Sequence, residues 1–231
     1  MKDVLGLENN YTGERRAQVD RRAKSDRQML RAAISLIAAH GSKNVSMAQI
    51  GMAAGYSRGL PSERFGTKLR LLEAVVSTTE AWFEKRLQSV LEGKIGLDAL
   101  SARIIAHMES VRDSSEAAIA LYQLIVEATG TVAELKPRIT ELNQSYANGM
   151  MIHLEEARAK GELKEGIDID RHALSIVSAM HGLAIQALIR DDVGSLGPDV
   201  RYIATIFIST IAKDSENIEA IFKSIHKGAV E

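Results

Sequence analysis

The segment 46–68, SMAQIGMAAGYSRGLPSERFGTK, constrains the fold more than any other part of this 231-residue chain. Ser46 is a good N-cap residue, because its hydroxyl can accept a hydrogen bond from a backbone N–H of a first helical turn. Met47 and Ile50 then lie on one helical face. Gly55 follows, where a left-handed backbone costs least. The spacing predicts a short helix from Ser46 to just before Gly55.

A second short helix is predicted after a turn of about three residues. Ser57 is expected to be its N-cap and Arg58 its first residue, while Leu60 faces inward and Gly66 ends the helix. Pro61 falls in the first turn, where a missing N–H costs little. Two short helices joined by a tight turn, the second of them polar, are typical of a DNA-binding helix-turn-helix.

Apolar periodicity predicts helices on both sides of this motif. One runs from Ser25 or Asp26 to His40 and packs behind the two short helices, and a long one runs from about Thr67 to Leu91. Everything after Gly96 is also predicted to be helical, with breaks near 112–115, 129–131, 161–170, 191–197 and 213–214. The stretch 200–211 is rich in β-branched residues but keeps helical spacing, so it is assigned to a helix. The expected fold class is all-α.

The charge is unevenly distributed along the chain. The formal net charge is -1, yet residues 1–70 hold 13 Lys and Arg against 6 Asp and Glu, a net +7, and the remainder carries -8. Because phosphate neutralisation supplies much of the affinity for DNA, the positive half is the expected DNA-binding part. Residues 1–22 are interpreted as a flexible basic arm, 23–70 as the helix-turn-helix domain, and 71–231 as a helical regulatory and dimerisation domain.

Composition narrows the class of protein. The chain has no cysteine, which excludes disulfides and thiolate metal sites. It shows no N-terminal apolar segment and no apolar run approaching about 18 residues, so a soluble cytoplasmic protein without a membrane segment is expected. Its six histidines form no i, i+4 pair, and neither a metal nor another cofactor is expected. Nucleophile-elbow, phosphate-loop and HExxH motifs are missing from the sequence, so an enzyme is not expected, although an all-α enzyme stays the less favoured alternative.

The segment 171–190 is apolar around most of its helical circumference. A surface helix of a monomer of this size is not expected to be so, and we therefore predict that it lies in a subunit interface. Together with the helix 198–212 it would form a four-helix bundle with its copies in a homodimer. The alternative is a central core helix in a monomer.

A set of residues between about 25 and 75 occurs in the order and spacing of one known family. These residues are Leu30, Ala33, Ile37, Gly41, Ser46, Ile50, Ala54, Gly55, Ser57, Gly59, Phe65, Lys68, Leu71 and Leu72. On them the chain resembles the tetracycline-repressor (TetR) family of bacterial transcriptional regulators. The run GELKEGIDID at 161–170 also looks like that family's approach to its dimerisation helices.

The resemblance implies an architecture and a function. The expected architecture is an N-terminal three-helix helix-turn-helix domain joined by a long helix to a C-terminal helical domain for ligand binding and dimerisation. The expected function is a repressor that binds a near-palindromic operator as a homodimer and is released by a small-molecule effector. A dimeric DNA-binding or interaction protein without a ligand is the alternative.

The resemblance also implies roles for individual residues. Arg58 is the candidate for base contact, since a guanidinium can donate two hydrogen bonds to guanine. The family often has Tyr and His where this chain has Ser62 and Arg64. The complete set of expected DNA-binding residues is Ser46, Ser57, Arg58, Gly59, Ser62, Arg64 and Lys68, of which Ser46, Ser57, Arg64 and Lys68 are assigned to phosphates. For Arg64 and Lys68 the alternative is a solvated surface charge.

A ligand pocket is expected among polar-tipped or adaptable side chains on the otherwise apolar helices of the C-terminal domain. The candidates are Trp82, His107, Met108, Tyr122, Tyr146, Met150, His153 and His181. For each of them the alternative is a place in the core without ligand contact.

Overall fold

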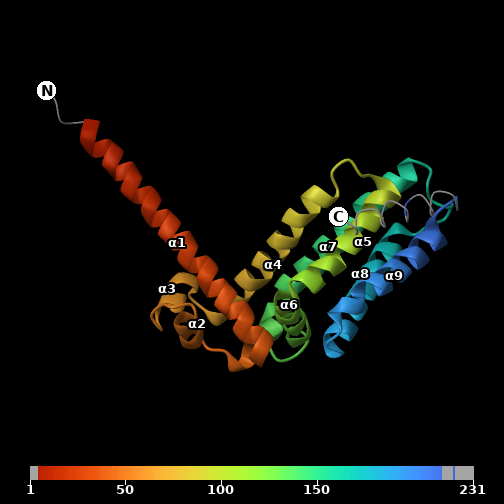
Figure 1. The fold of residues 1–231 in the computed structure, drawn as a ribbon. Helices are drawn as coiled ribbons and strands as arrows, with labels where there is room; N and C mark the ends of the chain where they lie inside the picture. The colour runs from red at the N-terminus through yellow and green to blue at the C-terminus, as the bar shows by residue number, and fades with distance from the viewer. Residues whose placement is uncertain (1–4, 215–220, 222–231) are drawn as a thin grey trace. The chain divides into compact units, whose positions relative to one another are not determined.

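The computed structural model describes the backbone of residues 5–214 and 221, and the side chains of that range from residue 18 onward, Ser195 excepted. The helices are α1 (Leu5–His40), α2 (Met47–Ala53), α3 (Leu60–Phe65), α4 (Lys68–Val90), α5 (Gly96–Asp113), α6 (Ser115–Glu127), α7 (Lys136–Ala159), α8 (Ile169–Ile189) and α9 (Leu196–Ile211) (Figure 1). Single 3-10 turns, η1 (Ser42–Asn44), η2 (Ala133–Leu135) and η3 (Val193–Ser195), lie in the connections. Within the described residues no strand occurs, and the all-α fold class is confirmed.

The chain divides into two compact units, residues 1–75 and 76–231. The division falls inside α4, so this one helix contributes its first turns to the N-terminal unit and the rest to the C-terminal unit. The sequence placed the domain boundary at residue 70, before the second turn of the same helix.

The core of the N-terminal unit forms where the apolar period predicted it. Met29, Ala33 and Ile37 of α1 are fully buried, as are Leu71 and Val75 of α4. α1 packs against α2, and α2 against α3. The helix that begins near Ser25 in the prediction thus does pack behind the two short ones.

α1 begins much earlier than the sequence indicated. Its first residue is Leu5 rather than Ser25, so most of the arm predicted to be flexible is helical, while residues 1–4 of that arm lie outside the described residues. The side chains of residues 18–22 are exposed. A helix with no core against it needs no apolar stripe, and its Arg, Glu, Gln and Ala residues are good helix formers, so periodicity could not reveal it.

α5 is the central helix of the C-terminal unit. It packs against α6, α7, α8 and α9, and buries Leu97, Leu100, Ile104 and Met108. The predicted breaks near residues 112–115, 129–131, 161–170 and 191–197 all separate helices in the structure, and the β-branched stretch after residue 200 is helical as expected. Most of the predicted domain after Asp214 lies outside the described residues.

α8 and α9 pack side by side (Figure 1). Both helices leave large apolar side chains exposed. Leu174 and Ile189 of α8 are 62% and 73% exposed, and Tyr202 of α9 is 68% exposed. By length and composition α8 could cross a membrane, but the core helix of a soluble protein meets the same criteria. α8 packs against α5, α7 and α9, but only 33% of its most apolar stretch is buried.

Candidate DNA-binding surface and ligand cavity

The start of α2 is fixed by a reciprocal pair of hydrogen bonds. The Gln49 N–H donates to Ser46 Oγ at 3.2 Å, and the Ser46 N–H donates to Gln49 Oε1 at 2.7 Å. This is a capping box, in which two otherwise unpaired backbone donors are satisfied at once. The predicted N-cap role of Ser46 is confirmed.

The connection between α2 and α3 differs from the prediction. Gly55 has the predicted left-handed backbone, with φ of 80°, but the turn extends to Gly59, which is the N-cap of α3. The predicted N-cap Ser57 is therefore wrong: its carbonyl oxygen accepts from the Leu60 N–H at 3.3 Å within the turn. Arg58, expected inside the helix, lies in this turn and is exposed. Because the turn runs on to Gly59, α3 has no side-chain cap at its start. Pro61 lies in the first turn of α3, and its fixed φ favours the start of a helix there.

Gly51 allows α2 and the turn before α3 to touch. A Cβ at this position would overlap the Ser57 carbonyl oxygen and lie 3.0 Å from Pro61 Cδ. Both Gly51 and Pro61 are buried. The sequence analysis gave Gly51 no role, although a glycine inside a predicted helix is a signal of close backbone approach.

Arg64 holds α3 against α1. Its Nε donates to Asp26 Oδ1 at 2.8 Å and its Nη2 to Asp26 Oδ2 at 2.6 Å, and Nη2 also reaches the Arg22 carbonyl oxygen at 3.1 Å. The Arg64 side chain is only 11% exposed. Arg64 is therefore not the solvated surface charge of the alternative interpretation, while its phosphate contact stays a prediction. The partner, Asp26, lies 38 residues away in the sequence, so local pattern could not identify it.

The other expected DNA-binding residues lie on the surface of the N-terminal unit. Ser46, Ser57, Arg58, Gly59 and Ser62 are exposed, and all but the first belong to the continuous stretch 57–62. Lys68 is half-buried at the start of α4, where its Nζ donates to the Lys43 carbonyl oxygen at 3.4 Å.

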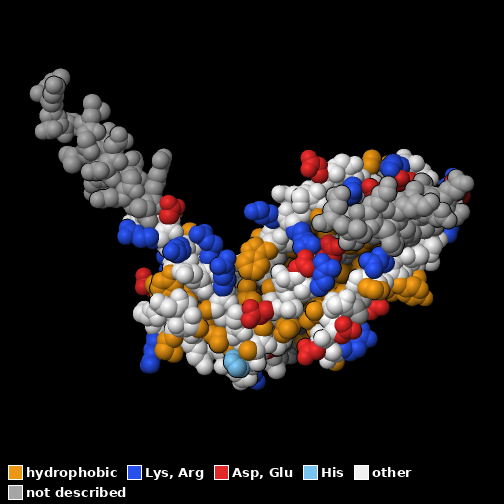
Figure 2. Space-filling view, in the orientation of Figure 1, with side chains coloured by type: hydrophobic (Ala, Val, Ile, Leu, Met, Phe, Trp, Pro, Cys, Tyr) orange, Lys and Arg blue, Asp and Glu red, His pale blue; other side chains and the backbone are white. Residues whose placement is uncertain are grey.

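Further cations lie on α1 beside this stretch. Arg21, Arg22 and Lys24 are exposed and line an open groove together with Gly55 and Tyr56 of the turn. The Tyr56 hydroxyl donates to Gln28 Oε1 and so fixes the turn to α1. Figure 2 shows Lys and Arg side chains gathered along the described part of α1. The sequence had placed Arg21 and Arg22 on a flexible arm; as parts of a helix they have fixed positions.

The C-terminal unit encloses a cavity of about 290 Å³. Five of the eight candidate ligand residues line it, and each comes from a different helix of α4 to α8: Trp82, His107, Tyr122, Tyr146 and His181. The other three lie elsewhere. Met108 faces Leu196 and Val200, Met150 is buried in α7, and His153 is hydrogen-bonded to Glu156.

Aromatic rings form a connected cluster at the cavity. The Phe83 and His107 ring centroids are 4.9 Å apart, and those of His107 and Tyr146 are 5.2 Å apart, in both cases edge to face. The Tyr122 and His181 rings meet in the same manner at 5.6 Å. Such edge-to-face pairs stabilise ring clusters beyond simple burial. Phe83 was not a sequence candidate, because an apolar aromatic residue on a periodic face is usually core.

The titratable groups of the cluster are uncharged at neutral pH. Burial, with further effects of His181 and Arg103, lowers the pKa of His107 to about 3. Burial also lowers the pKa of His181. The pKa values of Tyr122 and Tyr146 are raised, chiefly by burial. The cluster therefore presents neutral imidazoles and protonated phenols.

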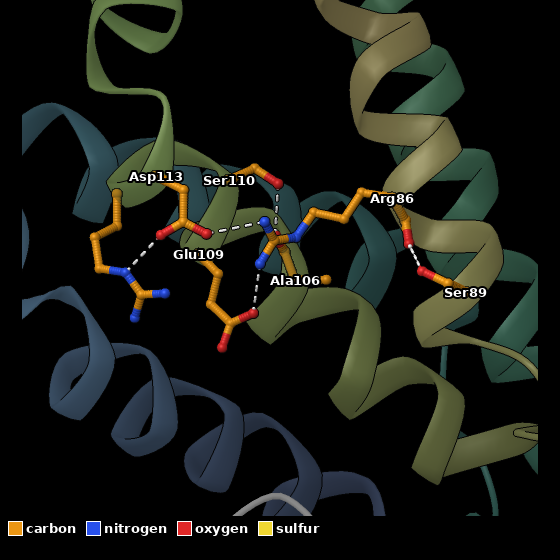
Figure 3. Close-up of polar contacts among 7 residues, drawn as sticks. Arg86, Ser89, Ala106, Glu109, Ser110 and Asp113 are labelled. Atoms are coloured by element: carbon orange, nitrogen blue, oxygen red, sulfur yellow. Dashed lines mark hydrogen bonds and ion pairs between the residues drawn. The ribbon is translucent and has the colours of Figure 1, made fainter. Parts of the chain in front are cut away.

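Arg86 lies at the edge of the cavity with its charge compensated (Figure 3). Its Nη2 donates to Glu109 Oε2 and its Nη1 to Asp113 Oδ2, both at 2.9 Å, and the Arg86 side chain is 35% exposed. Asp113 in turn accepts from Arg112 Nε at 2.8 Å. These contacts join α4 to α5 beside the cavity.

Among the residues that the structure describes, no three His, Asp or Glu side chains are grouped so that they could hold a metal ion.

Comparison with known proteins gives a family match for the N-terminal unit and a fold match for most of the chain. Residues 29–75 match the model of the family described as bacterial regulatory proteins, tetR family. No curated protein sequence matches the chain.

Several solved structures have a similar fold. A TetR transcriptional regulator from Chloroflexus aurantiacus is 20% identical with a TM-score of 0.70, covering 84% of this chain and 98% of that one. SmeT, the repressor of the Stenotrophomonas maltophilia multidrug efflux pump SmeDEF, is 20% identical with a TM-score of 0.70, covering 82% and 91%. The regulator FadR from Bacillus subtilis, in complex with stearoyl-CoA, is 22% identical with a TM-score of 0.70, covering 79% and 97%.

Proposed function

Because the chain belongs to the tetR family of bacterial regulatory proteins, we propose that it is a transcriptional repressor that binds operator DNA as a homodimer and releases it when a small molecule occupies the cavity. The observation that carries this proposal is the pairing of two features in one chain. An exposed helix-turn-helix lies in the basic N-terminal unit, and a cavity lies in the C-terminal unit. α4 contains residues of both units.

DNA recognition is assigned to the exposed stretch 57–62. Arg58 reads a base edge in the major groove, and the hydroxyls of Ser46, Ser57 and Ser62 contact phosphates together with Lys68. Arg21, Arg22 and Lys24 add phosphate contacts from α1, since they are exposed beside that stretch. Arg64 has a positioning role through Asp26.

Dimerisation is assigned to the exposed apolar face of α8 and α9. Leu174, Ile189, Tyr202 and Ile206 expose large apolar side chains there. Exposed apolar groups that lie together mark interaction surfaces on soluble proteins. Two copies joined by this face would present two recognition surfaces to the half-sites of a near-palindrome.

Release by a ligand is supported by the part that α4 plays in the cavity. Trp82, Phe83 and Arg86 of this helix all line it. A ligand that binds better to one position of α4 than to another shifts the population toward that position. The similar FadR structure holds stearoyl-CoA, and SmeT is named as a repressor, which agrees with ligand-controlled repression here.

The experiment that tests this function is selection of bound fragments from genomic DNA, followed by titration of the selected operator at several salt concentrations. We expect Arg58→Ala to relax sequence preference. Lys68→Ala should instead weaken binding to every sequence and reduce the salt dependence. Lys85→Ala, an exposed lysine later in α4, is the matched control and should change neither.

Two outcomes contradict the assignment. An equal loss of Arg58→Ala binding to operator and random duplex contradicts base reading by Arg58. A purified protein that selects no DNA fragment contradicts the function itself.

A further inference from the structure

The lining of the cavity in the C-terminal unit restricts the class of molecule that fits it. We propose that its ligand is a compact, uncharged aromatic molecule with one hydrogen-bonding group, such as a substituted phenol. This assignment rests on the proposed function, because it names the effector class of the same cavity. It follows from the size of the cavity, its rings, its charges and two buried nitrogen atoms.

The size of the cavity sets the first limit. Its volume of about 290 Å³ compares with about 30 Å³ for one water molecule in the liquid. A space of about ten waters holds one or two rings with small substituents. Drug-sized ligands usually occupy cavities of about 300 to 1,000 Å³, so this cavity is at the small end.

The ring cluster favours an aromatic ligand. Phe83, His107 and Tyr146 form a mutual edge-to-face set, with centroid distances of 4.9, 5.2 and 5.7 Å. His181 contacts both this set and Tyr122. All five rings belong to residues that line the cavity. A further ring can join the cluster through the same edge-to-face or offset contacts.

The charges of the lining favour an uncharged ligand. Among the described residues of the lining, Arg86 is the side chain that is charged at neutral pH, and both of its terminal nitrogens already donate to carboxylates. An anionic ligand at Arg86 would be repelled by Glu109 and Asp113, whose two carboxylates already exceed the single charge of Arg86. A cationic ligand would compete with Arg86 for those same carboxylates. A buried ion without a partner is far more costly than a buried neutral group, so either ion is selected against.

Two nitrogen atoms of the lining, Arg86 Nε and His107 Nε2, are buried without a hydrogen-bond partner. His107 is 7% exposed. Buried polar atoms in native proteins are nearly always paired. A ligand hydroxyl can either donate to His107 Nε2 or accept from it, according to the imidazole tautomer.

The test is calorimetric titration of the full chain at pH 7 with three ligands that share one ring and one bulky substituent. They are 4-tert-butylphenol, 4-tert-butylbenzoate and 4-tert-butylbenzylammonium. We expect the phenol to bind at least about tenfold more tightly than either ion, because only the ions must lose hydration without gaining a partner. Equal or tighter binding of either ion overturns the proposal, and so does a lack of binding by all three.

A pair of variants tests the role of His107. His107→Phe keeps the ring and removes the nitrogen, so affinity for the phenol should fall about tenfold, while affinity for tert-butylbenzene should be unchanged. His40→Phe makes the same replacement at an exposed histidine outside the cavity and should change neither affinity. Circular dichroism and thermal unfolding check that both variants are folded. Wild-type affinity of folded His107→Phe for the phenol overturns the assignment of His107.

The two proposals fail in different ways. If the phenol binds preferentially but leaves the operator complex intact, the ligand class holds and the proposed release mechanism is contradicted. If an ion binds more tightly and releases the operator, the proposed function holds and the ligand class is overturned.

Discussion

Arg64 shows how one residue can have a different role from the one that its position in a motif indicates. It lies in α3 among residues assigned to DNA, yet it donates both to Asp26 and to the backbone of Arg22 on α1. A guanidinium held by two parallel hydrogen bonds to one carboxylate has a fixed direction as well as a favourable energy. We therefore propose that Arg64 contributes to DNA binding by setting the position of α3.

Replacement of Arg64 by alanine should destabilise the N-terminal unit rather than remove a phosphate contact. We expect a loss of about 1 to 2 kcal/mol in the free energy of unfolding, because hydrogen bonds to charged groups are lost at a site partly screened by solvent. Urea unfolding measures this loss, with Arg27→Ala, an exposed arginine of α1, as control. A lower salt dependence of DNA binding by folded Arg64→Ala would instead indicate a phosphate contact.

Gly51 and Gly59 offer a second comparison at single positions. Gly51→Ala should lower the free energy of unfolding by about 1 to 3 kcal/mol, because its Cβ meets the Ser57 carbonyl and the Pro61 ring. Gly59→Ala should stay within about 0.5 kcal/mol of the wild type, because nothing lies within 4 Å of a Cβ there. Chemical denaturation of both variants measures the difference. Equal stability would show that the turn can move away from α2 at no cost.

The start of α5 shows how an element depends on side chains from another. The Gly96 N–H donates to Glu156 Oε2 at 3.1 Å, and the Leu97 N–H donates to Glu162 Oε2 at 2.9 Å. Both carboxylates lie more than 50 residues away in sequence, on α7 and just after it. They satisfy two of the first N–H groups of the helix and face its positive end.

The Glu156 contact predicts a pH dependence of stability. A hydrogen bond with His153 at 3.0 Å, and next the one from Gly96, hold the pKa of the Glu156 carboxyl below its usual value of 4.5, against an opposing effect of burial. A lowered folded pKa adds stability that is present above the usual pKa and is lost as pH falls through the folded value. The wild type should therefore lose stability below about pH 4.5.

Glu156→Gln isolates this contribution. Its unfolding free energy should fall less steeply than that of the wild type between about pH 5 and pH 3, as measured by urea unfolding at each pH. Glu155→Gln is the matched control, because Glu155 is the neighbouring residue and makes only an exposed ion pair with Arg158. An equal fall in the unfolding free energy of Glu156→Gln and of the wild type at acid pH would contradict the role of this carboxylate.

Helices could be predicted from the sequence where one of their faces packs against a hydrophobic core. The buried stripes of α1, α4 and α9 have the 3.6-residue period, and glycines mark several of the breaks. The part of α1 before Ser25 and the start of α3 were not predictable in this way, because residues 18–22 are exposed and α3 has a glycine N-cap without a side-chain signal. The cavity was predictable only in part. Trp82 and His107 were predicted to line the cavity because each carries a polar group on its ring. Phe83 and Arg86 can be assigned to the lining only when the positions of several helices are known.

At the scale of the whole molecule, the basic and acidic parts of the sequence correspond to the two structural units. The basic part is the N-terminal unit, whose described cations lie on α1, η1 and α3, in the turn before α3 and at the start of α4. The acidic part encloses a cavity whose lining is neutral apart from a compensated arginine. DNA affinity should therefore come from the first unit and ligand affinity from the second. Each can be altered by mutation without change in the other, except where dimerisation links them.

Dimerisation links the C-terminal unit to DNA affinity. One dimer that contacts two half-sites binds DNA far more tightly than one protomer binds a single half-site. Joining two binding modules raises overall affinity by about 10² to 10⁴, through the effective concentration of the second module. Loss of the dimer should therefore cost affinity for a two-half-site operator and leave affinity for a single half-site unchanged. Ligand binding should also be unchanged, since Leu174, Ile189, Tyr202 and Ile206 of the proposed interface do not line the cavity.

Leu174→Asp and Ile206→Asp test this link, since they place charges on the exposed apolar face of α8 and α9. We expect analytical ultracentrifugation to show monomers, and gel shifts to show about 10² to 10⁴-fold weaker binding to the full operator. Ile152→Asp on α7 is the control, because Ile152 is 58% exposed but lies outside that face. A dimer that survives both substitutions would place the interface elsewhere. A monomer with full operator affinity would show that the two half-sites are bound independently.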